Sequence, residues 1–244
     1  TNFTEKVNLE YLISLVESML TPYVWSEFNV LLTPQFKYLG LENPNLVYIV
    51  PDQMDSESLL AHELVHSWFG NLVTNKNWEN FWLNEGITTF FEMKLGKIYK
   101  GDEHFNKLVL EYNSSLMDLI DHFGMDSSHT SLHPEYCHTD PLKNYSLLPY
   151  YKGALLLRYL ESMIGEENIL SILRSYIEEF KYKSIGYTDF VAFFEGKFLE
   201  KGIKQVSEKV KVEAKELNKE GMIKESESGL VIEQVDWEYW IKGT

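Results

Sequence analysis

Hydrophobic residues recur at helical spacing along most of the chain. Near the N-terminus, Leu9, Leu12 and Val16 fall on one stripe, which predicts a helix over residues 7–20. A stripe of this kind buries one face of a helix against the rest of the protein. The same spacing predicts six further helices, over residues 56–70 (capped by Asp55 or Ser56), 79–97, 104–122, 150–164, 167–180 and 187–200.

Two shorter apolar segments predict β-strands. One runs from Tyr23 to Leu32, and the other runs from Leu46 to Val50, where Pro51 closes it. Between them, Gly40, Asn43 and Pro44 indicate a loop. The strands precede most of the predicted helices, so the first part of the chain is expected to be mixed.

The predicted elements give an α+β fold that is mostly α. We expect a small mixed α/β lobe over residues 1–55 and a helical lobe over residues 56–200. Residues 124–144 have few periodic apolar positions and many turn-forming ones, which is typical of a long functional loop. A charged block at 201–228 has apolar residues at helical spacing, and we interpret it as a charged helical insertion.

Composition narrows the function classes. The 244 residues are 44% hydrophobic, which is enough for one large or two small domains. The formal net charge of -15 argues against nucleic acid as a partner, because the phosphates would be repelled. No apolar run approaches a membrane span, and no signal-peptide pattern opens the sequence. The single cysteine, Cys137, allows no internal disulfide, so a cytoplasmic location is expected.

The strongest chemical signal is His-Glu-Leu-Val-His at residues 62–66. Histidines at i and i+4 lie one turn apart on the same helix face, so His62 and His66 can reach one ion. A catalytic zinc takes three protein ligands and leaves a position for water. Glu63 would face that water and accept its proton as general base. Alone, the five residues also fit a solvated helix.

A second segment, Trp-Leu-Asn-Glu-Gly at 82–86, supplies a third ligand. The spacing between His66 and Glu85 leaves room for one helix to end and a second to return alongside it. We therefore predict one zinc per chain, bound by His62, His66 and Glu85. Glu92 lies two turns beyond Glu85 on the same face. It could accept a hydrogen bond from a ligand histidine or form an ordinary salt bridge, and the sequence does not decide between them.

Together these segments resemble the gluzincin zinc aminopeptidases, the family that includes aminopeptidase N and leukotriene A hydrolase. The resemblance covers most of the chain. The run Tyr-Ser-Leu-Leu-Pro-Tyr-Tyr-Lys-Gly at 145–153 and the residues Gln234 to Trp237 are similar to the leukotriene A hydrolase branch. The resemblance implies a thermolysin-like catalytic domain over residues 1–200, with zinc between its two lobes.

The family also has a Gly-x-Met-Glu-Asn motif that selects free N-termini. Here the matching run is Leu39-Gly40-Leu41-Glu42-Asn43, which departs from the motif at Leu39 and Leu41. Glu42 would bind a free α-amine through a charge-assisted hydrogen bond, and Gly40 would lie on a strand beside the peptide. The alternative for Glu42 is a turn residue before Asn43 and Pro44.

Tyr150 matches the family tyrosine that stabilises the transition state. A phenol directed at the developing oxyanion acts only when that charge forms. Tyr145 is expected to line the substrate pocket. Tyr38 is a second candidate for that wall, with core packing as its alternative.

In this family a β-rich domain precedes the catalytic domain and a helical domain follows it. Both are expected to be missing here, and residues 229–244 would be the end of the catalytic domain and a linker. The expected partners are peptides with a free N-terminus.

Three functions are open: a zinc aminopeptidase, an epoxide hydrolase of the leukotriene type, and a non-catalytic peptide-binding module. The aminopeptidase is favoured because every zinc and acid–base position is present. In the leukotriene A hydrolase branch an aspartate lies three residues before the first of the two tyrosines, and here that position is Leu142. Leucine has no acceptor with which to direct water.

Overall fold

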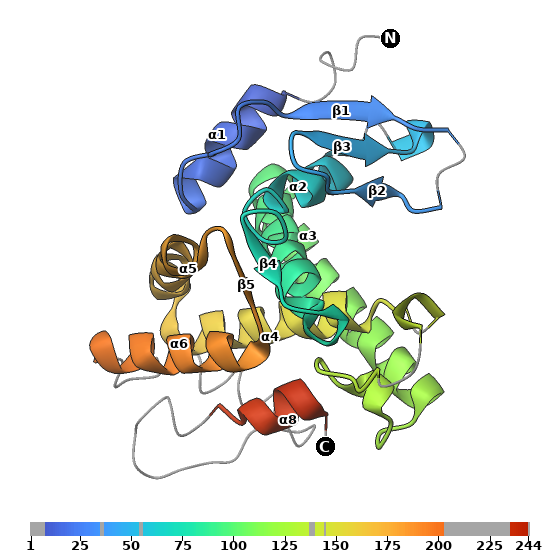
Figure 1. The fold of residues 1–244 in the computed structure, drawn as a ribbon, viewed down its shortest axis with the longest axis vertical. Helices are drawn as coiled ribbons and strands as arrows, with labels where there is room; N and C mark the ends of the chain where they lie inside the picture. Colours follow the sequence, from blue (N-terminus) through green and yellow to red (C-terminus); the bar gives the residue numbers. More distant parts are fainter. Residues whose placement is uncertain are drawn as a thin grey trace.

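The computed structural model describes residues 8–34, 37–53, 56–136, 140–143, 145–202 and 235–243. Its first part is a small lobe in which helix α1 (Leu9–Met19) lies beside a three-stranded sheet (Figure 1). The strands are β1 (Asn29–Leu32), β2 (Gly40–Leu41) and β3 (Leu46–Ile49). β3 lies in the middle, parallel to β1 and antiparallel to β2.

This lobe confirms the first predicted helix and the second predicted strand. The first strand is shorter than expected, because only the last four residues of the stretch from Tyr23 pair with β3. The sequence predicted a loop around Gly40, with backbone that runs beside the peptide as a strand. In the structure, Gly40 and Leu41 form a two-residue edge strand paired with β3.

Helix α2 (Glu57–Val65) carries the first half of the metal motif. The Ser56 side chain caps its N-terminus by accepting a hydrogen bond from the Leu59 backbone N–H at 3.2 Å. Asp55 lies outside the described residues. The helix ends at Val65 and not at Gly70, because the chain turns there toward the short strand β4 (Val73–Asn75).

Helix α3 (Trp82–Phe123) replaces two predicted helices. The residues before it, Trp78–Asn80, form a 3-10 helix, so α3 begins three residues later than the predicted start at Glu79. At Gly101 the backbone leaves the helical region (φ 85°, ψ 177°), and a second helical segment follows directly. Glycine adopts this positive φ without a steric cost, which explains why the break falls there.

The helical lobe is completed by α4 (Leu148–Ile164), α5 (Glu166–Phe180) and α6 (Tyr187–Glu200). Between α5 and α6, strand β5 (Lys183–Ile185) pairs in parallel with β4, a contact that the sequence did not predict. The core of the helical lobe includes several fully buried side chains, among them Phe69, Phe90, Leu157 and Phe194.

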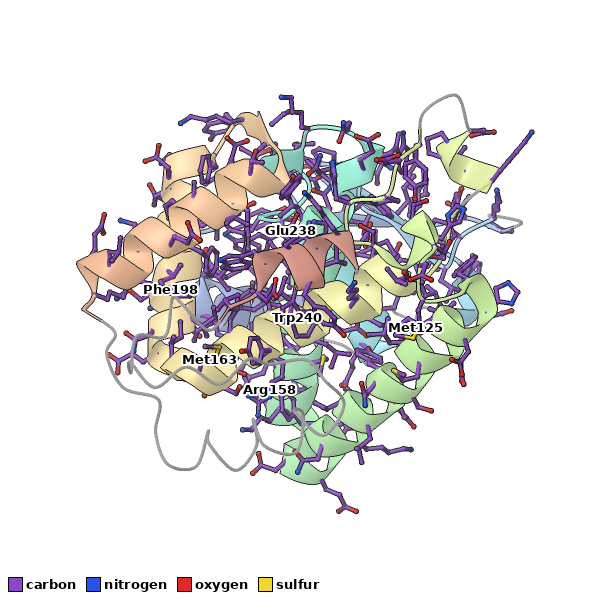
Figure 2. The ribbon with its side chains drawn as sticks, turned by 90° about the horizontal axis from the view of Figure 1, so that it is seen from below. Met125, Arg158, Met163, Phe198, Glu238 and Trp240 are labelled. Carbon is purple, nitrogen blue, oxygen red and sulfur yellow. The ribbon has the colours of Figure 1, made fainter. Side chains whose placement is uncertain are left out.

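The last described helix, α8 (Trp237–Lys242), lies against α4 (Figure 2). The Trp240 ring stacks on Tyr159 of α4, with the ring centroids 5.5 Å apart. The backbone carbonyl of Ile241 accepts hydrogen bonds from the Ser131 hydroxyl and the His133 N–H, which fixes the loop after α3.

That loop follows the predicted course, with two short 3-10 helices in it, Ser128–Thr130 and Pro141–Lys143. Cys137 and Gln234 lie outside the described residues, as does all of the predicted insertion at 201–228 beyond Gly202. Among the described helices, none is long and apolar enough to cross a membrane. The observed content of many helices and two small sheets confirms the predicted α+β, mostly α fold.

Candidate metal centre

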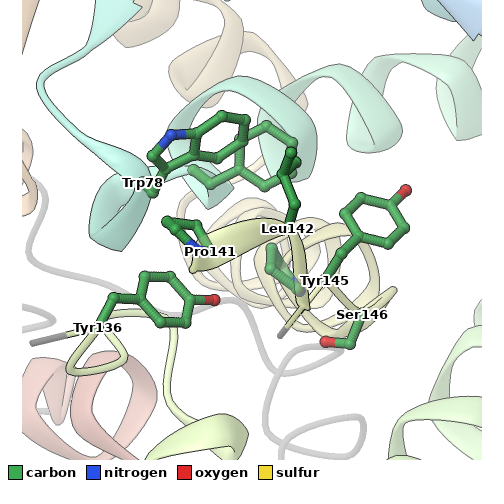
Figure 3. Close-up of a pocket in the computed structure, with 8 residues that line it drawn as sticks. Trp78, Tyr136, Pro141, Leu142, Tyr145 and Ser146 are labelled. Atoms are coloured by element: carbon green, nitrogen blue, oxygen red, sulfur yellow. The ribbon is translucent and has the colours of Figure 1, made fainter. Parts of the chain in front are cut away.

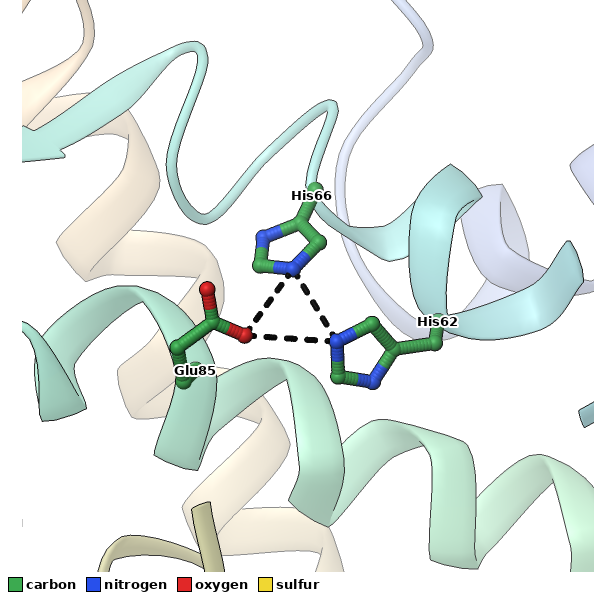
Figure 4. Close-up of side chains that lie close together, drawn as sticks. All are labelled: His62, His66 and Glu85. Atoms are coloured by element: carbon green, nitrogen blue, oxygen red, sulfur yellow. Dashed lines mark hydrogen bonds and ion pairs between the residues drawn. The ribbon is translucent and has the colours of Figure 1, made fainter. Parts of the chain in front are cut away.

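Three side chains from two helices form a triangle of possible metal ligands (Figure 4). His62 lies in α2, His66 is its C-cap residue, and Glu85 lies in the first turn of α3. The two histidine Nε2 atoms are 3.1 Å apart, and Glu85 Oε2 lies 3.3 Å from the His62 Nε2 and 3.2 Å from the His66 Nε2. The structure thus brings together the three residues predicted as ligands.

The triangle has the size that zinc requires. Tetrahedral zinc with bonds of about 2.0–2.1 Å to nitrogen and oxygen places its ligand atoms about 3.3–3.4 Å apart. The outer nitrogens of both rings meet oxygen acceptors: His62 Nδ1 lies 3.0 Å from Glu92 Oε2, and His66 Nδ1 lies 2.9 Å from the Phe69 carbonyl. Each Nδ1 therefore carries a proton, and both Nε2 lone pairs face the centre of the triangle.

The charges of the triangle also favour a cation. Burial opposes ionisation of Glu85, but His66 and His62 outweigh it and lower the pKa of Glu85 to about 2. Burial likewise opposes protonation of His66, yet Glu85 and Glu42 raise its pKa to about 9. The pocket thus attracts positive charge strongly, and a divalent cation can take the place of these protons.

Glu92 resolves an alternative that the sequence left open. Its Oε2 accepts from His62, and its Oε1 accepts a hydrogen bond from the Ser58 hydroxyl. Glu92 therefore lies behind a histidine of the triangle and is itself held by α2. Such a partner fixes the tautomer and the orientation of the ring.

Glu63 lies beside the triangle and is buried, with 4% of its surface exposed. Burial raises the pKa of Glu63 to about 7. Its Oε2 has no hydrogen-bond partner among the described residues, which is unusual for a buried carboxylate oxygen. Its burial is therefore not compensated by any hydrogen bond from the described residues.

Gly40 and Glu42 bring strand β2 to the same place. A methyl group at Gly40 would lie 2.0 Å from Glu63 Oε1, so the backbone at Gly40 passes directly over this carboxylate. Ligand atoms of Glu42, Glu63 and His66 all lie within 4.8 Å of one another. Glu42 therefore lies beside Glu63 and His66.

The three predicted tyrosines lie side by side across the site. The Tyr150 ring is nearly parallel to His62, with centroids 6.1 Å apart. The Tyr145 hydroxyl donates a hydrogen bond of 3.0 Å to the Tyr150 oxygen. Tyr38, from the small lobe, contacts the Tyr145 ring edge-on at 6.2 Å and is partly exposed, so it does not lie in the core.

Next to Tyr145 is a small pocket (Figure 3). Phe81 on its wall contacts the Tyr150 ring edge-on at 6.0 Å, so the pocket adjoins the site. Leu142 lies on the wall and is half exposed. The lining residues are Trp78, Phe81, Tyr136, Pro141, Leu142, Tyr145, Ser146 and Pro149.

The chain is similar to known proteins over most of its length. The model of the peptidase family M1 domain matches residues 3–210. The chain belongs to peptidase family M1. Membership confirms the predicted family and, together with the fit of the donor triangle, the zinc cofactor. The family match does not test the roles of individual residues.

Relatives that the chain resembles include leucine aminopeptidases and a leukotriene A-4 hydrolase. Leucine aminopeptidase 2 of Aspergillus clavatus is 34% identical over 96% of this chain, and leukotriene A-4 hydrolase of Xenopus laevis is 38% identical over 81% of it. The aligned regions are 35% and 33% of those proteins. The chain thus spans about a third of the length of the curated relatives that it matches.

Solved structures agree with this assignment. The native leukotriene A4 hydrolase of Saccharomyces cerevisiae superposes with a TM-score of 0.78 and 28% identity, over 97% of this chain and 34% of that one. An M1 zinc metallopeptidase from Deinococcus radiodurans has a TM-score of 0.64 over 78% of this chain and 40% of that one. At 23% identity the second match supports the fold alone.

Proposed function

We propose that this chain holds the catalytic centre of a zinc aminopeptidase, which hydrolyses the first peptide bond of peptides with a free N-terminus. The observation that carries the proposal is the buried Glu63 carboxylate beside the donor triangle, with one oxygen that has no partner among the described residues. Burial of a carboxylate oxygen without a partner is costly, and a reactant that uses this oxygen explains why the fold keeps it.

Four residues carry the metal and proton-transfer parts of the proposed reaction. His62, His66 and Glu85 hold zinc, which supplies Lewis-acid chemistry by polarising a carbonyl and lowering the pKa of water. Glu63 accepts the proton of the attacking water and transfers it to the leaving amine. Burial raises the pKa of Glu63, which makes its carboxylate a better acceptor for the proton of the water.

Tyr150 is proposed to stabilise the oxyanion of the tetrahedral intermediate. Its hydroxyl oxygen accepts a hydrogen bond from Tyr145, which leaves the Tyr150 proton free for the substrate. Burial raises the pKa of Tyr150 well above its usual value, so the phenol stays protonated and can donate.

Glu42 is proposed to bind the substrate amine. It lies on the edge-strand side of the site, where a peptide can pair with β2 in an extended conformation. An amine held by Glu42 limits how far the peptide enters, so that only its first peptide bond reaches Glu63.

The decisive experiment is Glu63→Gln. The amide cannot accept a proton, so kcat should fall by about 10³-fold or more, while the protein still binds about one zinc per chain. Metal analysis and an assay with aminoacyl chromogenic substrates measure the two effects. Glu57→Gln, a change at the start of the same helix, should leave both unchanged.

A Glu63→Gln protein with a near-normal rate would remove Glu63 from the mechanism. Failure of the parent to bind stoichiometric zinc would remove the metal centre itself. Equal hydrolysis of N-acetylated and free peptides by the parent would make the enzyme an endopeptidase and not an aminopeptidase.

A further inference from the structure

Helices α3 and α4 touch at two glycines, Gly86 and Gly153. A methyl group at Gly86 would lie 2.6 Å from the Gly153 Cα and 2.9 Å from the Pro149 carbonyl oxygen, and one at Gly153 would lie 2.7 Å from the Gly86 Cα. Non-bonded carbon atoms pack at about 3.5–4.0 Å. The obstructing atoms are all backbone, so no side-chain rotation relieves the overlap. An alanine at either position must move one helix away from the other.

The contact lies directly beside the catalytic groups. Gly86 follows the proposed ligand Glu85, and Gly153 follows Tyr150 by three residues. Residues at i and i+3 share a helix face, so Tyr150 and Gly153 lie on the same face of α4. Pro149, whose carbonyl meets Gly86, immediately precedes Tyr150. The touching turns are therefore the ones that carry Glu85 and Tyr150.

Helices α3 and α4 supply different groups to the site. All three zinc ligands come from α2 and its C-cap and from α3, whereas Tyr150 comes from α4. The distance from the Tyr150 hydroxyl to the metal site is therefore set by the separation of α3 and α4. At the contact between Gly86 and Gly153 the two backbones leave no room for a methyl group, so the separation of α3 and α4 depends on both glycines.

We propose that Gly86 and Gly153 are positioning residues that place the Tyr150 hydroxyl at bonding distance from the oxyanion. This inference rests on the proposed role of Tyr150. A misplacement of about 1 Å in a catalytic group can lower a rate about 10²-fold. Neither glycine touches the reacting atoms, and both act through the position of α4.

Gly153→Ala tests the proposal in the full chain. We expect kcat to fall about 10- to 100-fold with a change in KM of less than about threefold, because the transition state loses a hydrogen bond that the ground state does not use. The affinity for zinc should stay the same, since α4 supplies no ligand. The matched control is Gly196→Ala in α6, where no atom of a described residue lies within 4 Å of the added methyl group, and its kinetics should equal those of the parent.

A double-mutant cycle shows whether the effect passes through Tyr150. Tyr150→Phe alone should lower kcat, and Gly153→Ala added to it should lower kcat by no more than about threefold further. A full and independent loss in the double variant would overturn the proposal, because the glycine would then act elsewhere. A normal kcat for Tyr150→Phe alone would instead overturn the role of Tyr150 in the proposed function.

A binding measurement makes the test independent of turnover. An aminophosphonate peptide analogue mimics the tetrahedral intermediate, and its affinity, measured by calorimetry on the zinc-loaded protein, should fall about tenfold in Gly153→Ala. Parent-like affinity and kcat in Gly153→Ala would overturn the inference. If Gly153→Ala does not fold, Gly86→Ala takes its place. Failure of both to fold, while Gly196→Ala folds, would show that the contact serves only stability and would also overturn it.

Discussion

At the scale of single residues, Glu42 and Glu63 show how two carboxylates beside the same histidine are suited to different tasks. Glu63 is buried on a helix, and its pKa of about 7 favours proton exchange. Glu42 is partly exposed at the edge of a sheet, on the side from which a peptide can approach. Its negative charge suits an ammonium group, which needs a fixed counter-charge and no proton transfer.

Glu42→Gln should separate recognition of the amine from catalysis. The variant loses the charge that pairs with the ammonium, so the affinity for an amino-acid hydroxamate should fall about 10- to 100-fold. An N-acetylated hydroxamate has no ammonium, and its affinity should change by no more than about threefold. Inhibition constants for the two compounds measure the difference.

Glu10→Gln provides the control for this experiment, because Glu10 is an exposed carboxylate on α1 of the same lobe. It should leave both inhibition constants unchanged. If Glu42→Gln weakens both hydroxamates equally, Glu42 does not recognise the amine.

The sequence predicts some of these residues better than others. His62 and His66 follow from helical spacing alone, since i and i+4 always share a face. The placement of Glu85 depends in addition on a second helix that returns alongside the first, which the spacing allows. The contact of Gly86 with Gly153 could not be predicted, because helical periodicity shows which face is buried but not which two helices meet there.

At the scale of secondary structure, the errors have a common physical cause. Strands β4 and β5 have three residues each, too few for an alternating pattern, and each exists because it pairs with the other across a long stretch of sequence. Most helices are predicted because their periodic stripes are long, and their ends differ where tertiary contacts decide the start and the end, as for α2. The two helices predicted within α3 follow each other directly at Gly101, and the six-residue helix α8 is too short to show a stripe.

Helix α4 also carries a buried amine whose charge is unfavourable in the fold. The Lys152 ammonium group donates to the Thr130 carbonyl at 2.9 Å, and burial lowers the pKa of Lys152 to about 8 from the usual 10.5. Between these two values the unfolded chain binds more protons than the folded one. The contribution of Lys152 to stability therefore rises with pH across this window.

Lys152→Met should remove this pH dependence. From pH 7.5 to pH 9.5 the stability of the parent should rise relative to the variant by about 1–2 kcal/mol. Urea unfolding of both proteins at each pH measures the difference, in which the contributions of other titrating groups cancel.

Lys107→Met serves as the control, because the Lys107 side chain is 70% exposed and its amine keeps its hydration in the fold. Its stability relative to the parent should not change over the same pH range. A parent and a Lys152→Met protein with parallel pH curves would show that the Lys152 amine is charged in the fold without penalty.

At the scale of the whole molecule, the candidate site is built where the small lobe meets the helical lobe (Figure 1). Glu42 directly follows strand β2, α2 supplies His62 and Glu63, and α3 and α4 supply Glu85 and Tyr150. The later elements α5, α6 and α8 contribute none of the predicted site residues; α5 and α8 lie against α4 and α6 against α5, and they support the site from behind. Along the chain, the predicted site residues therefore precede the helices that support them.

The pocket beside the site bears on the choice between peptide and epoxide chemistry. The wall of this pocket has Leu142 at the position where the leukotriene A hydrolase branch has an aspartate (Figure 3). The nearest carboxylate in the sequence, Asp140, uses its Oδ1 to accept a hydrogen bond of 3.0 Å from the Leu142 backbone N–H. Asp140 thus stabilises its own turn, and Leu142 offers no acceptor to direct water.

We therefore expect peptidase activity without position-specific epoxide hydrolysis. Lewis-acid activation can open a conjugated fatty-acid epoxide, but without a directing carboxylate water should add at several carbons. Incubation with the epoxide and chromatographic separation of the diols should give a mixture that resembles the non-enzymatic one. Leu142→Asp restores a carboxylate to the wall and should enrich one diol, whereas Leu142→Asn, of similar size and without charge, should enrich it less. A single dominant diol formed by the parent and lost in His62→Ala would contradict this expectation, and it would require Asp140 to reach the epoxide from its turn.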